Sequence, residues 1–448
     1  MGNILVPKFA YMHEKFVEEP ALYVNKGNIE SVGSESELVS QYPNAKVVHY
    51  PDRVFVPGTV NAHNHSFQSL LRGIAIDKPF LQWRDESLYR FSPQMRREDI
   101  YNGALFAFAE MMLAGVTTVC DFFYLHNFGL DSDEIVIQAA KDIGIRLVLA
   151  RTMYDWAGAP KGYLETVNQA VDNTLVLADK YKDDSMVTII PAPHSLHAAS
   201  PEMIVAGHEL AVKMHTKFHM HVAEEPFEVK DTMAKHHGKR TIEYLNDLGV
   251  VDERLAIVHG VWLSKSEIQL MGEKGASLNY CPSSNMFLAD GVTDIPKMAN
   301  NNINIALGSD GACGNNRISV FEEMRMTALL QKVVTQDALC VKCKQVFDMG
   351  TINGAKQLDL NSGAIEVGKA ADMVGIDLDD LSMQPMNSDL EQMLPNIVYA
   401  MQPTAIKEVF VNGRQTVRAG QLVNVKQVDL LNRIKKTMRH FDSVKQLS

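Results

Sequence analysis

Histidines and carboxylates with the spacing of metal ligands recur along the chain. His63 and His65 form a His-x-His pair after an apolar run, and His221, His259 and Asp310 lie at or just beyond later apolar runs. Alternate residues of a strand face the same side, so both imidazoles of the pair point the same way. Imidazole nitrogens and carboxylate oxygens bind divalent ions such as zinc. We therefore expect a divalent metal ion to be held by His63, His65, His221 and Asp310.

A candidate base follows one of these histidines. Glu224 lies three residues after His221, where the strand candidate gives way to a loop. A metal ion lowers the pKa of water towards 7, and a neighbouring carboxylate can then pass the proton to a substrate. We expect Glu224 to do this, and Glu225 and Glu228 to be solvated. Residues 189–194, which close the fourth strand candidate, include no lysine that could bridge two ions after carbamylation, which favours a centre with one ion.

A repeated alternation of strands and helices must position these residues. Eight strand candidates alternate with helical stretches, and several are continuously apolar, as strands buried on both faces are. They extend over about 250 residues, the usual size of a (β/α)8 barrel, in which the chemistry collects at the C-terminal ends of the strands. The strand candidates are residues 54–60, 116–123, 146–151, 187–191, 217–222, 255–259, 276–280 and 303–307.

Both ends of the chain have a β pattern instead. Strands are expected at 21–24, 29–32 and 46–50, and again at 371–376, 397–400, 408–411 and 415–418. We therefore predict an α/β protein with a (β/α)8 TIM-like barrel and a small β-sandwich domain built from both chain ends. Residues 1–57 form the first part of the sandwich, 58–362 the barrel, and 363–448 the second part with a C-terminal helix. Within that helix, residues 430–437 are most simply solvated.

Composition narrows the class of partner. The 448 residues include 46% hydrophobic ones and have a net charge of −11, with no basic run. This argues against nucleic acid as the main partner, because phosphate binding needs clustered Lys and Arg. The apolar runs are too short to span a membrane. Five scattered cysteines favour a reducing compartment. We expect a cytoplasmic enzyme with a small-molecule substrate and neither a nucleic-acid nor a membrane partner.

These motifs resemble the amidohydrolase superfamily, in its branch of single-metal deaminases and related hydrolases. The resemblance extends over essentially the whole chain and includes residues 56–58, 61–65, 193–195, 221–224, 258–260, 281–286, 307–311 and 363–372. It implies that one ion, Zn or alternatively Fe, is bound by the four ligands named above. It also implies that Glu224 protonates the substrate nitrogen, that His259 polarises the reacting group, and that Asp310 takes a proton from the attacking water. Relatives of this kind often form homo-oligomers.

Two groups within the superfamily share further motifs with this chain. Residues 69–73, 281–286 and 321–325 resemble the S-adenosylhomocysteine and methylthioadenosine deaminases. In those enzymes residues at the positions of Arg151 and His194 help to hold the nucleoside. Residues 66–68, 82–85, 123–126, 194–197 and 222–224 resemble N-formimino-L-glutamate iminohydrolase. There the substrate site is lined by residues that match Gln68, Arg84, Tyr124 and His194.

One residue of this chain departs from the iminohydrolase pattern and bears on the class of substrate. The second carboxylate-binding arginine of the iminohydrolase falls where this chain has His197. An imidazole binds a carboxylate less well than a bidentate guanidinium does. This disfavours a dicarboxylate substrate. Because the motifs after the seventh and eighth strand candidates follow the nucleoside deaminases, we favour hydrolytic deamination of an aminated heterocycle or nucleoside at an amidine-like carbon, with release of ammonia. A formimino deiminase and a triazine hydrolase or chlorohydrolase stay as alternatives. A non-catalytic scaffold is disfavoured, because every expected ligand is present.

Plainer roles remain open for several of these side chains. Arg84 would also suit a surface ion pair, Arg151 a structural ion pair within the barrel, and His197 a solvent-facing position. The chain has no second pair of Cys or His at zinc-finger spacing from Cys340 and Cys343, so no redox or zinc role is expected for them. Solvent-facing positions are expected for His126, His236 and His237.

Overall fold

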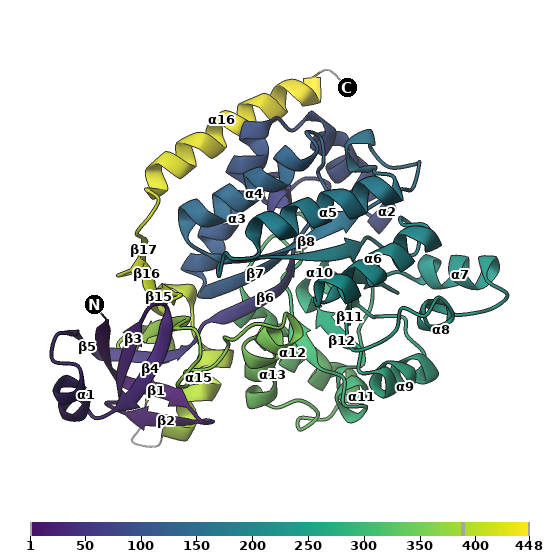
Figure 1. The fold of residues 1–448 in the computed structure, drawn as a ribbon. Coiled ribbons are helices and arrows are strands. Elements are labelled where there is room, and N and C mark those ends of the chain that lie inside the picture. Colours follow the sequence, from purple (N-terminus) through teal and green to yellow (C-terminus); the bar gives the residue numbers. More distant parts are fainter. Residues whose placement is uncertain (1, 387–389, 447–448) are drawn as a thin grey trace.

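The larger part of the protein is built around two parallel sheets (Figure 1). The structure is a computed structural model and describes residues 2–386 and 390–446. The strand orders are β6-β7-β8-β9 and β10-β11-β12-β13. Residues 1, 387–389, 447 and 448 of the expected small domain lie outside the described residues. The strands are β6 (Thr59–Asn64), β7 (Val116–Phe123), β8 (Arg146–Met153), β9 (Val187–Pro193), β10 (Phe218–Val222), β11 (Leu255–His259), β12 (Ser277–Tyr280) and β13 (Ile305–Leu307).

The two parallel sheets meet along both of their edges. Beside β9, the amide of His221 donates to the carbonyl of His194 at 3.0 Å. Beside β6, the amide of Asp310 donates to the carbonyl of His63 at 3.0 Å. This second approach requires a glycine, because a Cβ on Gly308 would lie 2.8 Å from the His63 Cβ. The arrangement is consistent with the expected barrel, and it brings the C-terminal ends of β6, β10 and β13 together.

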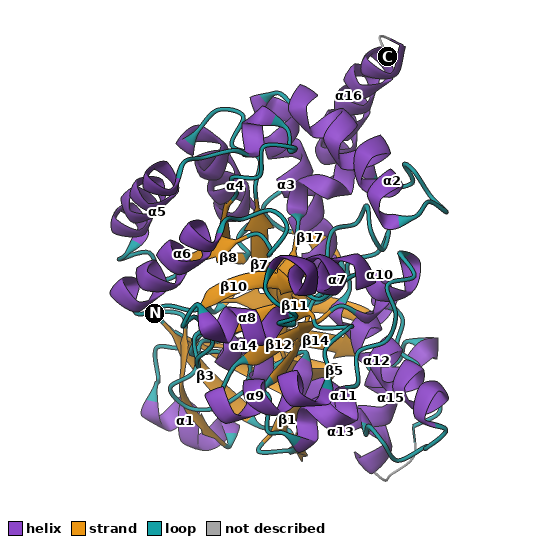
Figure 2. Cartoon of the chain, turned by 90° about the vertical axis from the view of Figure 1, so that its right-hand side faces the viewer, coloured by secondary structure: helices purple, strands orange, loops and turns teal. Residues whose placement is uncertain are grey.

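Helices surround these strands (Figure 2). Every residue of β7 and β8 is buried, as expected for parallel strands that are covered on both faces. The helix boundaries follow local signals: Ser264 caps the start of α9 through its hydroxyl, and Gly275 ends it in the left-handed conformation. The helices are α1 (Glu35–Gln41), α2 (Phe80–Arg84), α3 (Arg97–Leu113), α4 (Leu130–Ile143), α5 (Val167–Tyr181), α6 (Pro201–Met214), α7 (Pro226–Lys235), α8 (Thr241–Asp247), α9 (Lys265–Lys274), α10 (Pro282–Phe287), α11 (Ile295–Asn300), α12 (Val320–Thr335), α13 (Cys343–Met349), α14 (Ile352–Gln357), α15 (Met393–Tyr399) and α16 (Gln427–Gln446).

The two ends of the chain share one nine-stranded sheet, ordered β17-β16-β15-β14-β5-β1-β3-β4 with β2 paired to β1. Figure 1 shows the purple N-terminal strands beside the yellow-green C-terminal ones. The antiparallel pairing of β5 with β14 joins the two ends, which confirms that both contribute to one small unit. The strands are β1 (Asn3–Met12), β2 (Lys15–Glu18), β3 (Ala21–Asn25), β4 (Asn28–Gly33), β5 (Lys46–Pro57), β14 (Met373–Asp377), β15 (Ile406–Val411), β16 (Arg414–Arg418) and β17 (Gln421–Leu422).

Two of the expected strands were wrong, one in its extent and one in its type. The strand expected at 54–60 is two strands of different sheets, β5 and β6, separated at Gly58. The apolar pattern is continuous across that glycine and does not mark the change of sheet. The strand expected at 397–400 is instead the end of the helix α15. The buried residues of α15 form two adjacent pairs that are four residues apart, which is the spacing of one helix face. These are Met393, Leu394, Ile397 and Val398.

The C-terminal helix α16 is only partly solvated, contrary to the expectation for residues 430–437. Figure 1 shows it beside α3 at the top of the molecule. Leu430, Thr437 and Phe441 are buried, and the Asn102 amide of α3 donates to the Thr437 hydroxyl at 3.2 Å. Their spacing places these residues on one side of a helix. The expected stretch was too short to show this periodicity.

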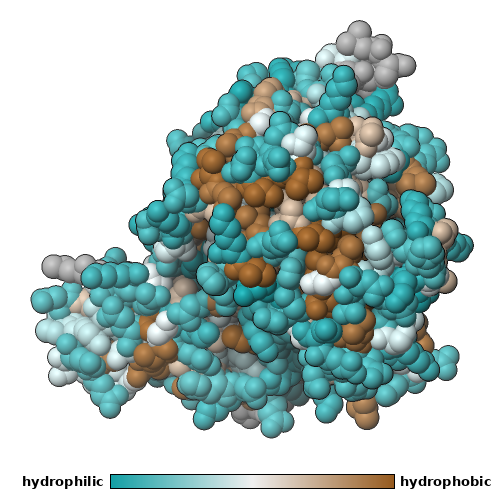
Figure 3. Space-filling view, turned by 45° about the vertical axis from the view of Figure 1, so that its right-hand side comes forward, coloured by the Kyte–Doolittle hydropathy of each residue, from teal (hydrophilic) through white to brown (hydrophobic). Residues whose placement is uncertain are grey.

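The surface is largely hydrophilic on the face shown in Figure 3, with apolar side chains gathered over its middle. Among the described residues, no helix has both the length and the apolar character needed to cross a bilayer.

Candidate metal centre and substrate pocket

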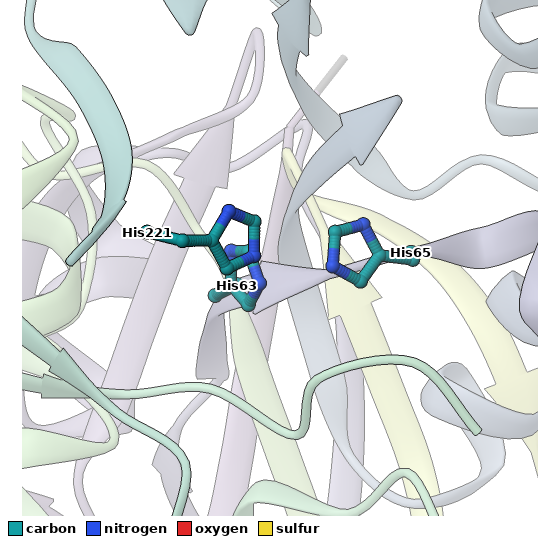
Figure 4. Close-up of side chains that lie close together, drawn as sticks. All are labelled: His63, His65 and His221. Atoms are coloured by element: carbon teal, nitrogen blue, oxygen red, sulfur yellow. The ribbon is translucent and has the colours of Figure 1, made fainter. Parts of the chain in front are cut away.

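Three imidazoles converge where the strand ends meet (Figure 4). His63 lies on β6, His65 directly follows that strand, and His221 lies on β10. One ligand atom from each lies within 4.8 Å of the other two. All three side chains are buried. The structure thus brings together the three histidines that the sequence predicted to share an ion.

Hydrogen bonds at Nδ1 of these rings determine which ring nitrogen is free to bind a metal ion. The Nδ1 of His65 lies 2.6 Å from the carbonyl of Phe122, and that of His221 lies 3.1 Å from the carbonyl of His194. A carbonyl only accepts, so each Nδ1 has the proton and each Nε2 has a lone pair. The Nε2 of His63 is buried and has no hydrogen-bond partner. Such a set of nitrogens fits a bound zinc ion.

The protonation state of the rings also suits a metal site. Burial lowers the pKa of His63 and His221 well below the usual value, and it lowers that of His65 as well. Desolvation disfavours the charged imidazolium, and the neighbouring imidazoles add to the effect in His63 and His221. Neutral imidazole is the form that binds a metal ion.

Asp310 is oriented towards these rings. Its Oδ1 lies 3.3 Å from the Nε2 of His65 and 3.7 Å from that of His63. The Ser284 hydroxyl donates to its Oδ2 at 2.6 Å, and the Gly311 amide donates to its Oδ1 at 2.6 Å. These two donors fix the carboxylate, so Asp310 is placed to serve as the fourth ligand.

Glu224 and His259 stand next to this site as a pair. The Nε2 of His259 lies 3.4 Å from Oε1 of Glu224, and its Nδ1 donates to the Asn285 side-chain oxygen at 2.9 Å. Burial lowers the pKa of His259, so this ring is neutral with its Nε2 as an acceptor. Burial, reinforced by the carboxyl group of Asp290, raises the pKa of Glu224 well above its usual value. A raised pKa favours the protonated carboxyl group, which is the form that a general acid needs.

Three residues at this site have a strained backbone conformation. Ala223, His259 and Asp310 have φ values of 53°, 69° and 57°, in the left-handed region. For a residue with a side chain this costs about 1–3 kcal/mol, and it persists only where the surroundings impose it. Here the strained residues are catalytic candidates or immediately precede one, so the fold holds these side chains in place against a local preference.

A pocket opens from these residues towards the solvent, and a concave site of this kind suits a small molecule. The structure places five of the six predicted substrate residues in its lining: Gln68, Arg84, Tyr124, His194 and His197. Sequence reasoning missed most of its apolar walls, because they lie on α2 and on short helical turns away from the strand ends. Tyr154, directly after β8, could have been found from its strand-end position. The missed lining residues are Phe80, Trp83, Leu88, Tyr89, Tyr154 and Tyr163.

The polar lining residues are already held by neighbours. The Gln68 amide donates to the Tyr124 hydroxyl at 2.9 Å. The Ser195 hydroxyl lies 3.0 Å from Nδ1 of His194 and 3.1 Å from Nδ1 of His197. His197 lines the pocket, with a side chain that is 19% exposed. Glu228, which was expected to be solvated, is buried in the first turn of α7.

The guanidinium of Arg84 is shared between a neighbouring carboxylate and the aromatic wall. Its Nε donates to Asp85 at 2.9 Å, and its cationic group lies 4.5 Å from the ring centroid of Tyr89. The side chain is 18% exposed. Arg84 thus combines the surface ion pair left open by the sequence with a place in the pocket.

Arg151 lies outside the pocket lining, in a buried ion cluster. Two of its nitrogens donate to the Glu165 carboxylate at 2.8 and 2.7 Å, and its Nε donates to Asp133 at 3.2 Å. His126, expected to face solvent, is buried beside this cluster with its Nε2 donating to the Thr152 carbonyl at 3.0 Å. The structural ion pair considered for Arg151 matches this geometry. The cluster anchors the segment that contributes Tyr154 and Tyr163 to the pocket.

Arg151→Met is expected to destabilise the protein. It would leave the carboxylates of Asp133 and Glu165 buried without their main partner, which costs about 3–5 kcal/mol. Chemical denaturation followed by circular dichroism measures the change. The matched control is Arg97→Met, which removes a largely exposed ion pair with Asp131 and should cost about 0–1 kcal/mol. Unchanged stability together with a raised KM would instead make Arg151 a substrate ligand.

Comparison with known proteins shows the family to which this chain belongs. Residues 54–416 match the model of the amidohydrolase family. A 5-methylthioadenosine/S-adenosylhomocysteine deaminase of Thermodesulfovibrio yellowstonii is 30% identical over 97% of this chain and 98% of its own. A 5'-deoxyadenosine deaminase of Methanosphaera stadtmanae is 31% identical over 96% of each chain.

Solved structures show the same fold. An adenosine deaminase from Xanthomonas campestris with bound zinc has a TM-score of 0.90 and 27% identity, over 99% of this chain and 98% of its own. The atrazine chlorohydrolase TrzN of Arthrobacter aurescens has a TM-score of 0.89 at 20% identity, over 97% of this chain and 99% of its own, a likeness of fold alone. The family match, which covers most of the chain, confirms the resemblance drawn from the motifs. The chain therefore belongs to the amidohydrolase family and is a hydrolase that acts on C–N bonds.

Proposed function

We propose that this protein is a zinc-dependent deaminase that releases ammonia from the aminated carbon of an adenine nucleoside, with a substituent other than hydroxyl tolerated at the 5' position. The observation that carries the proposal is the set of three histidines and Asp310 facing the Glu224–His259 pair at the base of an aromatic pocket. The names of the two curated relatives, each about as long as this chain, support the nucleoside. The zinc in the related adenosine deaminase supports the metal.

The proposed frame is a closed (β/α)8 barrel over residues 58–362. The hydrogen bonds from His221 to His194 and from Asp310 to His63 support closure, because each joins the two parallel sheets at one edge. The flanking residues 1–57 and 363–448 would form the small domain. Leu22 and Tyr23 are neighbours on β3 whose side chains point to opposite faces of the sheet. They belong to separate apolar clusters, one on each face, which supports a sandwich there. The five free cysteines support a cytoplasmic setting.

Each residue of the site has a chemical task in this reaction. A bound zinc ion supplies Lewis acidity and makes water a nucleophile at neutral pH. Asp310, fixed by Ser284, accepts the proton of the attacking water. Glu224 donates its proton to the ring nitrogen next to the aminated carbon and so makes that carbon more electrophilic. The Nε2 of His259 lies 3.4 Å from Oε1 of Glu224 and has no hydrogen-bond partner among the described residues, so it is free to bind the reacting group.

The pocket walls suit a planar heterocycle. The rings of Trp83, Tyr89, Tyr154 and Tyr163 offer apolar faces, and aromatic faces stack favourably on flat rings. The indole nitrogen of Trp83 already donates to the Cys313 carbonyl at 3.1 Å, so this ring is fixed before substrate arrives. Burial also lowers the pKa of His194 well below its usual value, which leaves it neutral beside an uncharged base.

A formimino amino acid is the second candidate, and Arg84 favours it. If Arg84 binds a carboxylate of the substrate, Arg84→Met should raise KM about 10- to 150-fold, the loss of a hydrogen bond to a charged group worth about 1.5–3 kcal/mol. Steady-state kinetics on the accepted substrate measures this. Arg90→Met, on the same segment but outside the pocket lining, is the matched control. An unchanged KM would remove Arg84 from substrate binding.

An ammonia-release screen tests the proposed function. Zinc-loaded protein is assayed with adenosine, 5'-deoxyadenosine, 5'-methylthioadenosine, S-adenosylhomocysteine, N-formimino-L-glutamate and a chlorotriazine, with Glu224→Gln protein as the blank. We expect ammonia from at least one adenine nucleoside. Turnover of the formimino compound or the triazine with none of the nucleosides would overturn the assignment.

A further inference from the structure

We propose that His219 is a positioning residue for the metal site: its Nε2 accepts the Nδ1 proton of His63 and so keeps the lone pair of His63 Nε2 directed at the ion. This inference rests on the proposed metal centre and not on the identity of the substrate. Neither the chemistry of the reaction nor the pocket lining uses His219.

The position of His219 follows from strand alternation. It lies two residues before His221 on β10, so both rings point to the same side of that strand. His219 lies below the metal site and is fully buried. Its ring stacks on that of His63 with centroids 5.3 Å apart and planes 18° apart. The two histidines thus contact the site from different sheets, one as a ligand and one as its support.

The direction of the hydrogen bond is set by the surroundings. The Nδ1 of His63 and the Nε2 of His219 are 3.2 Å apart. The side-chain nitrogen of Asn279, on β12, also lies 3.2 Å from that Nε2. An amide nitrogen only donates, so the Nε2 of His219 is the acceptor and the shared proton belongs to Nδ1 of His63. The remaining nitrogen of His219 faces the sulfur of Cys120 at 3.8 Å.

The arrangement completes a pattern in which each metal-binding imidazole has its own acceptor. His65 and His221 use backbone carbonyls, which cannot be removed by substitution. His63 uses a side chain. Without that acceptor the Nδ1 proton of His63 would be buried unpaired, or it would move to Nε2 and abolish metal binding there. Groups that orient a metal ligand in this way are typically worth 10- to 100-fold in metal affinity.

Two substitutions of His219 distinguish a hydrogen-bonding role towards His63 from a role in packing alone. His219→Gln keeps a side-chain oxygen that can accept the Nδ1 proton, whereas His219→Phe keeps a ring and removes the acceptor. Zinc affinity is measured by competition with a chelator, on the metal-free full-length protein. We expect the Phe variant to bind zinc about 10- to 100-fold more weakly than the unsubstituted protein, and the Gln variant to recover most of that loss.

Controls distinguish the possible outcomes. His208→Phe removes a peripheral histidine that pairs with Asp252 at 2.8 Å and should leave zinc affinity unchanged. Melting of the metal-free variants reports loss of folding, and ¹⁵N spectra of histidine-labelled, zinc-loaded Gln variant report the tautomer of His63 directly. Equal zinc affinity of the Phe variant and the unsubstituted protein, equal losses in both variants, or a His63 proton on Nε2 would overturn the proposal. These readouts are independent of whether any adenine nucleoside is deaminated.

Discussion

Glu224→Gln is expected to lower kcat by about 10²- to 10⁴-fold and to leave metal content unchanged. Glutamine keeps the size of the side chain and an oxygen near the Nε2 of His259, but it has no proton of carboxylic acidity to give to the substrate nitrogen. None of the four expected metal ligands is altered. Single-turnover kinetics and metal analysis of the same preparation measure both quantities.

The control for this variant is Glu228→Gln. Glu228 is a buried carboxyl group of the same region, but it lies outside the pocket lining and caps α7 through the Glu225 amide at 3.2 Å. Glutamine preserves the accepting oxygen, so kcat should change by less than about tenfold, within one 1.4 kcal/mol step. Near-normal ammonia release by Glu224→Gln would contradict the role given to Glu224.

Asp310→Asn is expected to abolish detectable turnover, with a loss in kcat of at least about 10³-fold. The substitution removes the negative charge beside the imidazoles and the group that accepts the proton of water, so two contributions are lost together. The amide would also place a donor where Ser284 now donates to Oδ2 at 2.6 Å. Progress curves over hours, with zinc in excess, measure the residual rate.

Ser284→Ala distinguishes the orientation of the Asp310 carboxylate from the proton transfer that this carboxylate performs. It removes only the hydrogen bond that fixes the carboxylate, so the loss in kcat should be much smaller than for Asp310→Asn. A similar loss in both variants would mean that orientation, and not proton transfer, is the main contribution of Asp310. Full activity of Asp310→Asn would exclude Asp310 from the reaction.

Much of the catalytic centre was predictable because strand ends are simple to locate. Buried parallel strands are continuous apolar runs, and polar residues directly after them must meet at one edge. This reasoning placed His63, His65, His221 and Asp310, which come from strands distant in sequence, at one site. Tyr124, named through the family resemblance, directly follows β7 and so has a strand-end position as well.

The remainder depends on tertiary contacts that leave no periodic signal. Arg151 ends the strand expected at 146–151, as pocket residues do, but β8 continues to Met153, and Glu165 and Asp133, from other segments, bind its guanidinium. His219 has the alternation of a strand residue beside His221, but its role depends on His63 in the other sheet. Residues 397–400 have the apolar composition of a strand, and only their packing as the end of α15 identifies the helix.

Metal analysis by inductively coupled plasma mass spectrometry, on protein freshly purified and after zinc loading, tests the central claim most directly. Three neutral imidazoles and one carboxylate predict about one zinc ion per chain. They also predict a sharp loss of bound zinc in His221→Ala, and no loss in His236→Ala, which removes a partly exposed histidine stacked on Tyr244. Full catalytic activity in protein that contains no divalent metal, or equal zinc content in His221→Ala and the unsubstituted protein, would contradict the account.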